Sequence, residues 1–503
     1  MKRVLLLVAL LLSIGIAVTL IRSTQSSSRQ LSSAQRRELA DALDVFAVDA
    51  NAAALRLAAA IQIPTVSDTD WSAASRARFE QLHALLETFY PLAWSELTIE
   101  VIREGSLLLH WVGEDPALEP VLLMAHLDVV PIEAETESQW EHAPFSGAIA
   151  DGKVWGRGAL DDKGAALAWF EAIESMLAAG VRPQRDTWFA MGHDEEIGGH
   201  QGNGMIAALL AQRGLRFAFV LDEGGFSTQG LVPLTDGPLA LIGVAEKGWM
   251  TVRLQATAPG GHSSVPEHPT AIERVAAAIA RVEQALFPPR IDGATHAFLE
   301  WLAPETDFAT RCVLSNLWWS ESIVTSMLGQ NAKTAAMIQT TYATTTIQGG
   351  VRENVLPSFA QAAINLRLLP GDSVPSTLET LRDAIDDDLI ELVLDKDARE
   401  ASAVSSVDCG AFQLLQRSIA CIAPEAIVAP YLVVGGTDSI HYRALSDRIY
   451  RFQPYRLTAG DVGRFHGPNE FVAIEQHADV IRFCQLVLGG LGRELLASPT
   501  VLR

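Results

Sequence analysis

The chain opens with an apolar segment unlike anything that follows it. No charged residue occurs from Val4 to Ile21, two basic residues precede this run, and a polar stretch, residues 22–35, comes after it. As a helix rising about 1.5 Å per residue, the run would span roughly 27 Å, close to the thickness of a bilayer core. It predicts a signal anchor or a cleaved signal peptide over residues 1–21, followed by a linker. The anchor is favoured because residues 15–17 form a weak cleavage site. Either way, the body of the protein is expected to be extracytoplasmic, periplasmic or secreted, and an anchor would tether it to the membrane.

Beyond the linker, apolar residues take the spacing of an amphipathic helix. Seven of them recur at intervals of three and four positions: Leu39, Leu43, Phe46, Ala50, Ala53, Leu57 and Ile61. This spacing places them on one face of a helix. We expect the helix to open a catalytic domain whose first part covers residues 36–245.

Short apolar runs then alternate with helical stretches. The runs are residues 121–125, 188–191 and 217–221, and a helical pattern covers residues 163–179. This alternation predicts the α/β class, with a mostly parallel sheet flanked by helices. In such sheets, ligands gather at the carboxyl ends of the strands.

The pattern changes near residue 246. Strand-like segments at residues 249–256 and 360–368 flank a helical pattern at 270–285, which is typical of an inserted α+β lid domain. Residues 287–348 form a long irregular insert in this lid. We therefore expect a lid over residues 246–370 and the second part of the catalytic domain over 371–503.

The composition of the chain limits its partners and the residues that could bind a metal. Of 503 residues, 49% are apolar, and 38 basic against 60 acidic residues give a net charge of -22. That charge disfavours nucleic acid as a partner, because no basic patch offsets it beside a phosphate backbone. The cysteines are too few and scattered for a thiolate zinc site, although the sequence allows a single disulfide between Cys409 and Cys421. Any metal must therefore be bound by histidines and carboxylates.

Acidic and histidine residues follow the apolar runs directly. His126 and Asp128 come after residues 121–125 and, two apart on a strand, point the same way, which suits an imidazole ligand and a carboxylate beside it. Four further segments contain acidic or histidine residues: Gly156–Gly164, His193–Gly199, Asp222–Gly225 and Phe465–Glu470. The second and third of them also come directly after apolar runs. Each alone could be a helix cap, a charged turn or a surface loop. Because strand ends in an α/β sheet converge, the five together predict a metal site.

In this order, the five segments resemble the zinc-dependent exopeptidase family that contains carboxypeptidase S, glutamate carboxypeptidase, aminoacylase and succinyl-diaminopimelate desuccinylase. The resemblance covers about residues 50–490. Trp155–Gly158, Asp222–Gly225 and the long lid insert are most similar to the branch of carboxypeptidase S and the N-fatty-acyl-amino-acid synthase/hydrolase. Three lid segments are similar as well: Gly260–Ser264, Asn354–Pro357 and Asn365–Arg367.

The resemblance implies two zinc ions bridged by one carboxylate. It assigns His126, Asp161 and Asp222 to one ion, and Asp161, Glu196 and His466 to the other. Oxygen and nitrogen ligands suit zinc, and a carboxylate can span two ions. Glu223 is the alternative to Asp222, since only one of two adjacent side chains can be aimed at the ion.

The resemblance also implies catalytic roles. Glu195 would take a proton from the attacking water and return it to the leaving amine, and Asp128 would orient the imidazole of His126. His262 resembles a histidine that stabilises the oxyanion, often across a dimer interface, which implies a homodimer through the lid. A turn histidine satisfied by its own loop is the alternative.

Substrate contacts are implied on the lid and on one loop. Arg367 resembles a carboxylate contact, with a simple lid salt bridge as the alternative. The other implied contacts are Asn354, Gly436, Thr437 and Asp438. Together they imply hydrolysis of an amide bond next to a free carboxylate, in a small peptide or an N-acyl amino acid. The alternatives are condensation of a fatty acid with an amino acid, and a noncatalytic binding protein, against which the presence of Glu195 argues.

Overall fold

The computed structural model describes residues 2–36, 47–232, 234–235, 237–283, 287–458 and 460–492, without the side chains of residues 2–9 and 462. Helix α1 (Lys2–Gln25) contains the predicted signal segment, which therefore lies partly outside the described residues. No helix within the described ranges is long and apolar enough to cross a bilayer. The predicted amphipathic helix appears as α3 (Ala50–Ile61), and its expected start falls outside the described residues.

The chain divides into two compact units. The larger unit comprises Ser27–Val244, Ser405–Tyr431 and Thr437–Arg503, and the smaller unit comprises Met1–Ser26, Ala245–Val404 and Leu432–Gly436. Residues 246–370, the predicted lid, fall inside the smaller unit. Helix α13 (Val374–Ile385) and strand β15 (Ile390–Leu394) follow that segment and belong to the same unit.

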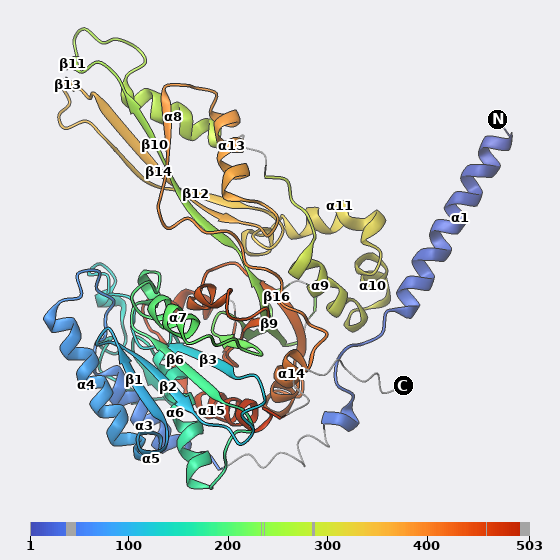
Figure 1. The fold of residues 1–503 in the computed structure, drawn as a ribbon. Helices are drawn as coiled ribbons and strands as arrows, with labels where there is room; N and C mark the ends of the chain where they lie inside the picture. Colours follow the sequence, from blue (N-terminus) through green and yellow to red (C-terminus); the bar gives the residue numbers. More distant parts are fainter. Residues whose placement is uncertain are drawn as a thin grey trace. The chain divides into compact units, whose positions relative to one another are not determined.

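A ten-stranded sheet forms the centre of the larger unit (Figure 1). Its order is β1-β2-β6-β3-β7-β17-β9-β8-β18, with β16 paired to β9. The strands are β1 (Thr98–Ile102), β2 (Ser106–Trp111), β3 (Val121–His126), β6 (Thr187–Gly192), β7 (Val220–Asp222), β8 (Phe226–Thr228), β9 (Leu239–Glu246), β16 (Ile427–Val433), β17 (Ile449–Arg451) and β18 (Arg456–Leu457). The central strands β6, β3, β7 and β17 are parallel. The predicted α/β fold with a mostly parallel sheet is confirmed.

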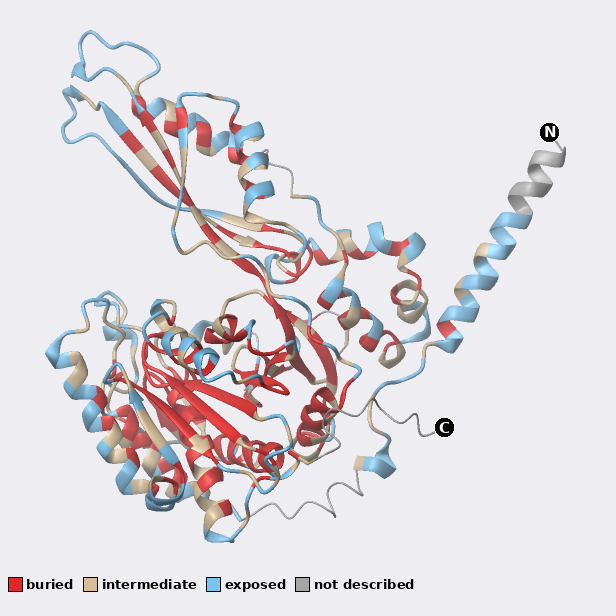
Figure 2. Ribbon diagram, in the orientation of Figure 1, coloured by how far each residue is buried: buried red, intermediate tan, exposed pale blue. Residues whose placement is uncertain are grey.

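Helices cover both faces of this sheet. Trp169 of α6 (Lys163–Ala178) contacts Phe189 of β6 with ring centroids 5.9 Å apart, while Ile206 of α7 (Asn203–Gln212) packs with Leu122 and Met124 from the opposite face. Helices α3 and α15 (Ile474–Gly489) pack beside α6. Strands β3 and β6 are consequently buried along their whole length (Figure 2), which explains their continuous apolar sequences.

The smaller unit is built on a four-stranded antiparallel sheet. Its order is β12-β14-β10-β15, with β10 (Gly248–Thr257), β12 (Thr341–Gly349) and β14 (Phe359–Leu368). Helices α8 (Ala271–Val282) and α13 pack on one face through a core that includes Met250, Val275 and Leu381. The expected strands and helix of the lid are therefore present.

The insert at residues 287–348 is not irregular, as its sequence indicated, but mostly helical. It contains α9 (Gly293–Leu302), α10 (Phe308–Leu314), α11 (Leu317–Leu328) and α12 (Ala332–Ala335), and then enters β12. These helices are short and capped by side chains such as Asp307 and Asn331. The longest of them, α11, has the length of α8 but exposes Trp318, Trp319 and Ile323, so its apolar residues show no helical periodicity. All four cysteines are free in this structure.

Candidate metal centre

Three parallel strands end at the same edge of the larger sheet and carry acidic or histidine residues there. β3 ends at His126, β7 ends at Asp222, and a 3-10 turn over Glu195–Ile197 follows β6. Because the carboxyl ends of neighbouring parallel strands lie together, these residues converge. The loop before α6 adds Asp161 to this edge, and the loop before β19 (Phe471–Ala473) adds His466.

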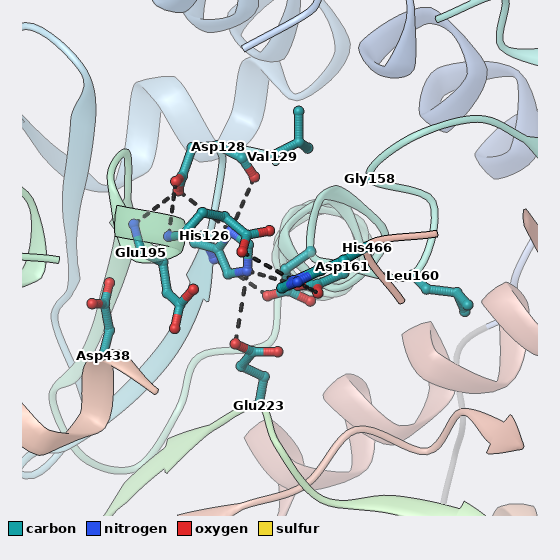
Figure 3. Close-up of polar contacts among 12 residues, drawn as sticks. His126, Asp128, Val129, Gly158, Leu160, Asp161, Glu195, Glu223, Asp438 and His466 are labelled. Carbon is teal, nitrogen blue, oxygen red and sulfur yellow. Dashed lines mark hydrogen bonds and ion pairs between the residues drawn. The ribbon is translucent and has the colours of Figure 1, made fainter. Parts of the chain in front are cut away.

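Asp161 lies between two imidazoles (Figure 3). Its Oδ1 is 2.9 Å from Nε2 of His126, and its Oδ2 is 3.2 Å from Nε2 of His466. His466 Nε2 also lies 3.1 Å from Oε2 of Glu196. Hydrogen bonds to Asp161 and Glu196 raise the pKa of His466 to about 10. The carboxylates of this cluster therefore stabilise positive charge beside them, and the imidazoles supply part of that charge.

Two groups of side chains could each hold a metal ion. Ligand atoms of His126, Asp161 and Glu196 lie within 4.8 Å of one another, and so do those of His126, Glu195 and Glu223. Nitrogen and carboxylate oxygen donors suit zinc. Glu196 Oε1 is buried and has no hydrogen-bond partner within the described part of the chain. An unsatisfied buried carboxylate oxygen is consistent with a missing ligand.

The structure does not bring the Asp222 carboxylate into this cluster, contrary to its assignment from the sequence. Asp222 is the last residue of β7, and its Oδ2 accepts a hydrogen bond from the backbone N–H of Ser439 at 2.8 Å. The next side chain, Glu223, points the other way, with Oε1 3.7 Å from His126 Nε2. Adjacent residues of an extended chain point in opposite directions, so only one can face the metal. The geometry favours Glu223, the alternative considered from the sequence.

Asp128 is placed to orient His126. The imidazole Nδ1 lies 3.0 Å from the Asp128 carbonyl oxygen and 3.3 Å from its Oδ1. A proton held on Nδ1 by these oxygens leaves the Nε2 lone pair free for a metal. The Asp128 carboxylate also accepts hydrogen bonds from the backbone N–H groups of Glu195 and Glu196, both at 3.1 Å, and from Ser67 Oγ at 2.7 Å. One carboxylate thus fixes both His126 and the acidic turn at Glu195 and Glu196.

Glu195 lies beside the cluster without a basic partner at hydrogen-bond distance among the described residues. Burial raises its pKa well above the usual range against the opposing charge of His126, and the negative charges of Asp438 and Glu196 add to this. Asp438, expected to contact substrate, is buried instead and accepts a hydrogen bond from Asn203 Nδ2 at 2.6 Å.

Two supporting carboxylates were not identified from the sequence. Glu470 accepts backbone hydrogen bonds from Gly158, Leu160 and Asp161 at 3.0, 2.8 and 3.2 Å, and pairs with Arg157 at 2.6 Å. It thereby fixes the loop that carries Asp161. Asp162 similarly accepts the backbone N–H of His126 at 3.2 Å and Gln453 Nε2 at 2.6 Å. Both lie in segments singled out by sequence, and only the fold shows which way they point.

The remaining expected contacts lie in the smaller unit, apart from Thr437, which begins the turn that holds Asp222. His262 is the last residue of the short strand β11 (Gly261–His262); it is exposed, and its Nδ1 lies 2.8 Å from Ser264 Oγ. Asn354 is exposed as well, while Arg367 on β14 and Gly436 belong to the same unit. Their proposed contacts with substrate therefore rest on resemblance.

Comparison with known proteins identifies the family. Residues 122–489 match the model of peptidase family M20/M25/M40. The mouse N-fatty-acyl-amino acid synthase/hydrolase PM20D1 is 38% identical over 432 residues, 85% of each chain. The probable carboxypeptidase S-like 2 of Dictyostelium discoideum is 35% identical over 434 residues, 86% of this chain and 83% of that one.

Solved structures share the fold. The M20 family metallo-carboxypeptidase Sso-CP2 from Sulfolobus solfataricus has a TM-score of 0.63 at 18% identity, covering 86% of this chain and 98% of that one. Human carnosine dipeptidase 1 has a TM-score of 0.61 at 13% identity, covering 91% and 98%.

The sheet and its cluster of acids and histidines define a metal-dependent hydrolase. The chain belongs to peptidase family M20/M25/M40. The similarity to carboxypeptidase S and N-fatty-acyl-amino-acid synthase/hydrolase, predicted from the sequence motifs, is confirmed.

Proposed function

We propose that this protein uses two zinc ions to hydrolyse an amide bond next to a free carboxylate, as a carboxypeptidase or an N-acyl-amino-acid hydrolase. The supporting observation is the convergence of two imidazoles and two further carboxylates on Asp161, with Glu195 beside them. Such a donor set fits zinc, and a carboxylate whose two oxygens face different ligands can bridge two ions.

In this proposal, His126, Asp161 and Glu223 hold one ion, and Asp161, Glu196 and His466 hold the other. When bound, zinc acts as a Lewis acid that polarises the substrate carbonyl and lowers the pKa of water. Glu223 replaces Asp222 because its carboxylate faces His126 and that of Asp222 does not.

Glu195 is the proton carrier of the proposed mechanism. Its carboxylate takes a proton from the attacking water and delivers it to the nitrogen of the leaving amine. The backbone N–H of Glu195 is fixed by Asp128, so the base and the orientation of His126 depend on one side chain. Each of the two proposed substrate classes is supported by the name of one relative. The probable carboxypeptidase supports a peptide, and the N-fatty-acyl-amino acid synthase/hydrolase supports an N-acyl amino acid.

The proposal is tested on purified full-length protein whose zinc content is measured on the same sample. We expect hydrolysis of N-acyl amino acids or dipeptides, loss of activity with a chelator, and recovery with zinc. If zinc-loaded protein cleaved neither substrate class, or if Glu195→Ala matched the wild type, the proposal would be abandoned. A product assay with oleate and a free amino acid tests the synthase direction, which the name of the PM20D1 relative suggests.

Three further expectations stay proposals: the homodimer through the lid, the extracytoplasmic location and the membrane tether. The first is supported by the likeness of His262 to an oxyanion histidine, and the other two by the uncharged run from Val4 to Ile21.

A further inference from the structure

A row of residues crosses the sheet of the smaller unit and carries two arginines. Trp249 of β10 lies opposite Arg367 of β14 on one side. On its other side it exchanges two backbone hydrogen bonds with Arg399, of 2.9 and 2.7 Å. Residues directly opposite on antiparallel strands project from the same face. Arg367 and Arg399 therefore share one face, two strand spacings or roughly 10 Å apart.

This face is the one turned away from the two helices. Met250 and Leu366, the neighbours of Trp249 and Arg367 along their strands, belong to the core under α8 and α13. Side chains alternate between the faces of a strand, so Trp249 and Arg367 lie on the opposite face. The row is thus on the face that α8 and α13 leave uncovered.

The two guanidinium groups have no acidic partner. Within the described part of the chain, neither Arg367 nor Arg399 forms an ion pair. Other arginines of this unit do: Arg253 with Asp395 at 3.1 Å, Arg274 with Asp387 at 3.1 Å, and Arg290 with Asp372 at 2.9 Å. Burial and the charge of Arg399 lower the pKa of Arg367. Two like charges in such a place are unfavourable unless an anion joins them.

A third cation lies next to the row. Lys247 donates to Thr341 Oγ1 at 3.1 Å, and Thr341 is the residue opposite Arg367 on β12. Its other acceptors are the carbonyl oxygens of Ala336 and Gln339, which carry no charge. Burial and the charge of Arg367 lower the pKa of Lys247 to about 7, and the carboxylate of Asp372, which pairs with Arg290, partly opposes this shift. Arg367 and Arg399 themselves have no carboxylate partner among the described residues.

Gly436 lets the Arg399 guanidinium approach the backbone. A Cβ built on Gly436 would lie 2.3 Å from Arg399 Nη2, so a side chain at this position would displace the guanidinium. Gly436 belongs to the loop that resembles a substrate-carboxylate contact. Arg399 is thus packed against that loop and shares a sheet face with the arginine expected to contact the same group.

We propose that Arg399 is a second contact for the substrate carboxylate, so that Arg367 and Arg399 bind its two oxygens from either side. The proposal rests on the proposed function and specifies its substrate class: a free carboxylate on the amino acid that leaves. Guanidinium groups bind carboxylates through paired N–H donors, and the long side chains can close the distance between their strands.

The test compares an N-acyl amino acid with its primary amide in full-length zinc-loaded protein. Arg399→Gln should raise KM for the carboxylate about 30-fold, because a charge-assisted hydrogen bond is lost, and change kcat little. The KM of the amide, or its Ki where it is not cleaved, should stay within about twofold. Arg399→Lys should recover part of the loss, and Gly436→Ala should reproduce the selective rise by moving the guanidinium.

Arg253→Gln is the matched control, since Arg253 lies on the same face of β10 but already pairs with Asp395. It should leave both constants unchanged. An unchanged KM for the carboxylate in Arg399→Gln would overturn the proposal, and so would equal changes for carboxylate and amide. Failure of the proposed function would appear differently, as a wild-type protein that cleaves neither compound. Thermal unfolding of each variant shows whether it is folded. If Arg399→Gln is not folded, the KM values of Arg399→Lys are compared with those of the wild type instead.

Discussion

Two regions of the molecule carry opposite excess charge. One is the edge of the larger sheet where His126, Glu195 and Glu223 lie, and the other is the open face of the smaller sheet, the face with Arg367 and Arg399 that α8 and α13 leave uncovered. At the edge, carboxylates outnumber the histidines they surround, and burial raises the pKa of Glu195 and Glu223. On this open face, Arg367 and Arg399 have no ion-pair partner among the described residues. Burial lowers the pKa of Arg367, and that of neighbouring Lys247 to about 7. We therefore expect a cation to bind in the first region and, in our proposal, an anion in the second.

The two regions also differ in how their side chains are held. Asp128 and Glu470 accept hydrogen bonds from backbone N–H groups at the acidic edge, which fixes the segments that carry Glu195, Glu196 and Asp161. Arg367 and Arg399 are long side chains without such partners within the described residues. The chemical step depends on fixed geometry at the reacting atoms. In our proposal, Arg367 and Arg399 bind the substrate carboxylate and do not contact the reacting atoms. Substitutions at the edge should therefore act on kcat and metal content, and substitutions on the open face on KM.

The largest effect is expected at Glu195. Glu195→Gln removes the proton carrier and should lower kcat about 1000-fold, with KM and zinc content nearly unchanged. Steady-state kinetics and metal analysis of the same sample measure both. Glu87→Gln, at an exposed position, is the control. A variant that kept more than a tenth of the activity would show that another group carries the proton.

The second largest effect is expected at Glu223 and not at the adjacent Asp222. Glu223→Gln should lose about one zinc ion per chain and lower kcat about 100-fold, because it removes a ligand. Asp222→Asn should retain its zinc, since this carboxylate faces Ser439. Zinc content by elemental analysis distinguishes them. The opposite result would restore Asp222 as the ligand.

A smaller effect is expected on the open face. Arg367→Gln should raise KM for a carboxylate substrate by about 10- to 100-fold and leave zinc content unchanged. Kinetics at saturating substrate give the kcat, which should be close to that of the wild type. If kcat fell and KM did not rise, the contrast between the two regions would be wrong.

The smallest effect on catalysis is expected at a histidine outside both regions. His477 in α15 is 1% exposed, its ring nitrogens have no hydrogen-bond partner among the described residues, and burial lowers its pKa to about 4. The unfolded chain, with a pKa near 6.5, binds this proton first, so stability should fall by about 3 kcal/mol as the pH drops from 6.5 to 4. Urea unfolding across this range measures the loss. His477→Gln should show a shallower decline, and an identical slope would refute the assignment.

The parts of the molecule that could be predicted share one physical property. β3 and β6 are buried on both faces, so their sequences are continuous apolar runs, and the residues that follow them are necessarily near the site. The choice between Asp222 and Glu223 could not be predicted, because it depends on which way two adjacent side chains point at a strand end. Arg399 lies in no motif and is found only through its pairing with Trp249. The helical insert was missed because α11, although as long as the predicted α8, does not gather its apolar residues on one face.

Glu470 has a consequence for how the protein is made. It fixes the loop of Asp161 from more than 300 residues further along the chain, and His466 comes from the same late segment. A chain still on the ribosome at residue 460 has synthesised most of the large sheet but neither of these side chains. The loop of Asp161 is therefore fixed, and the cluster of acids and histidines completed, only near the end of translation, so we expect a nascent or prematurely terminated chain to be inactive.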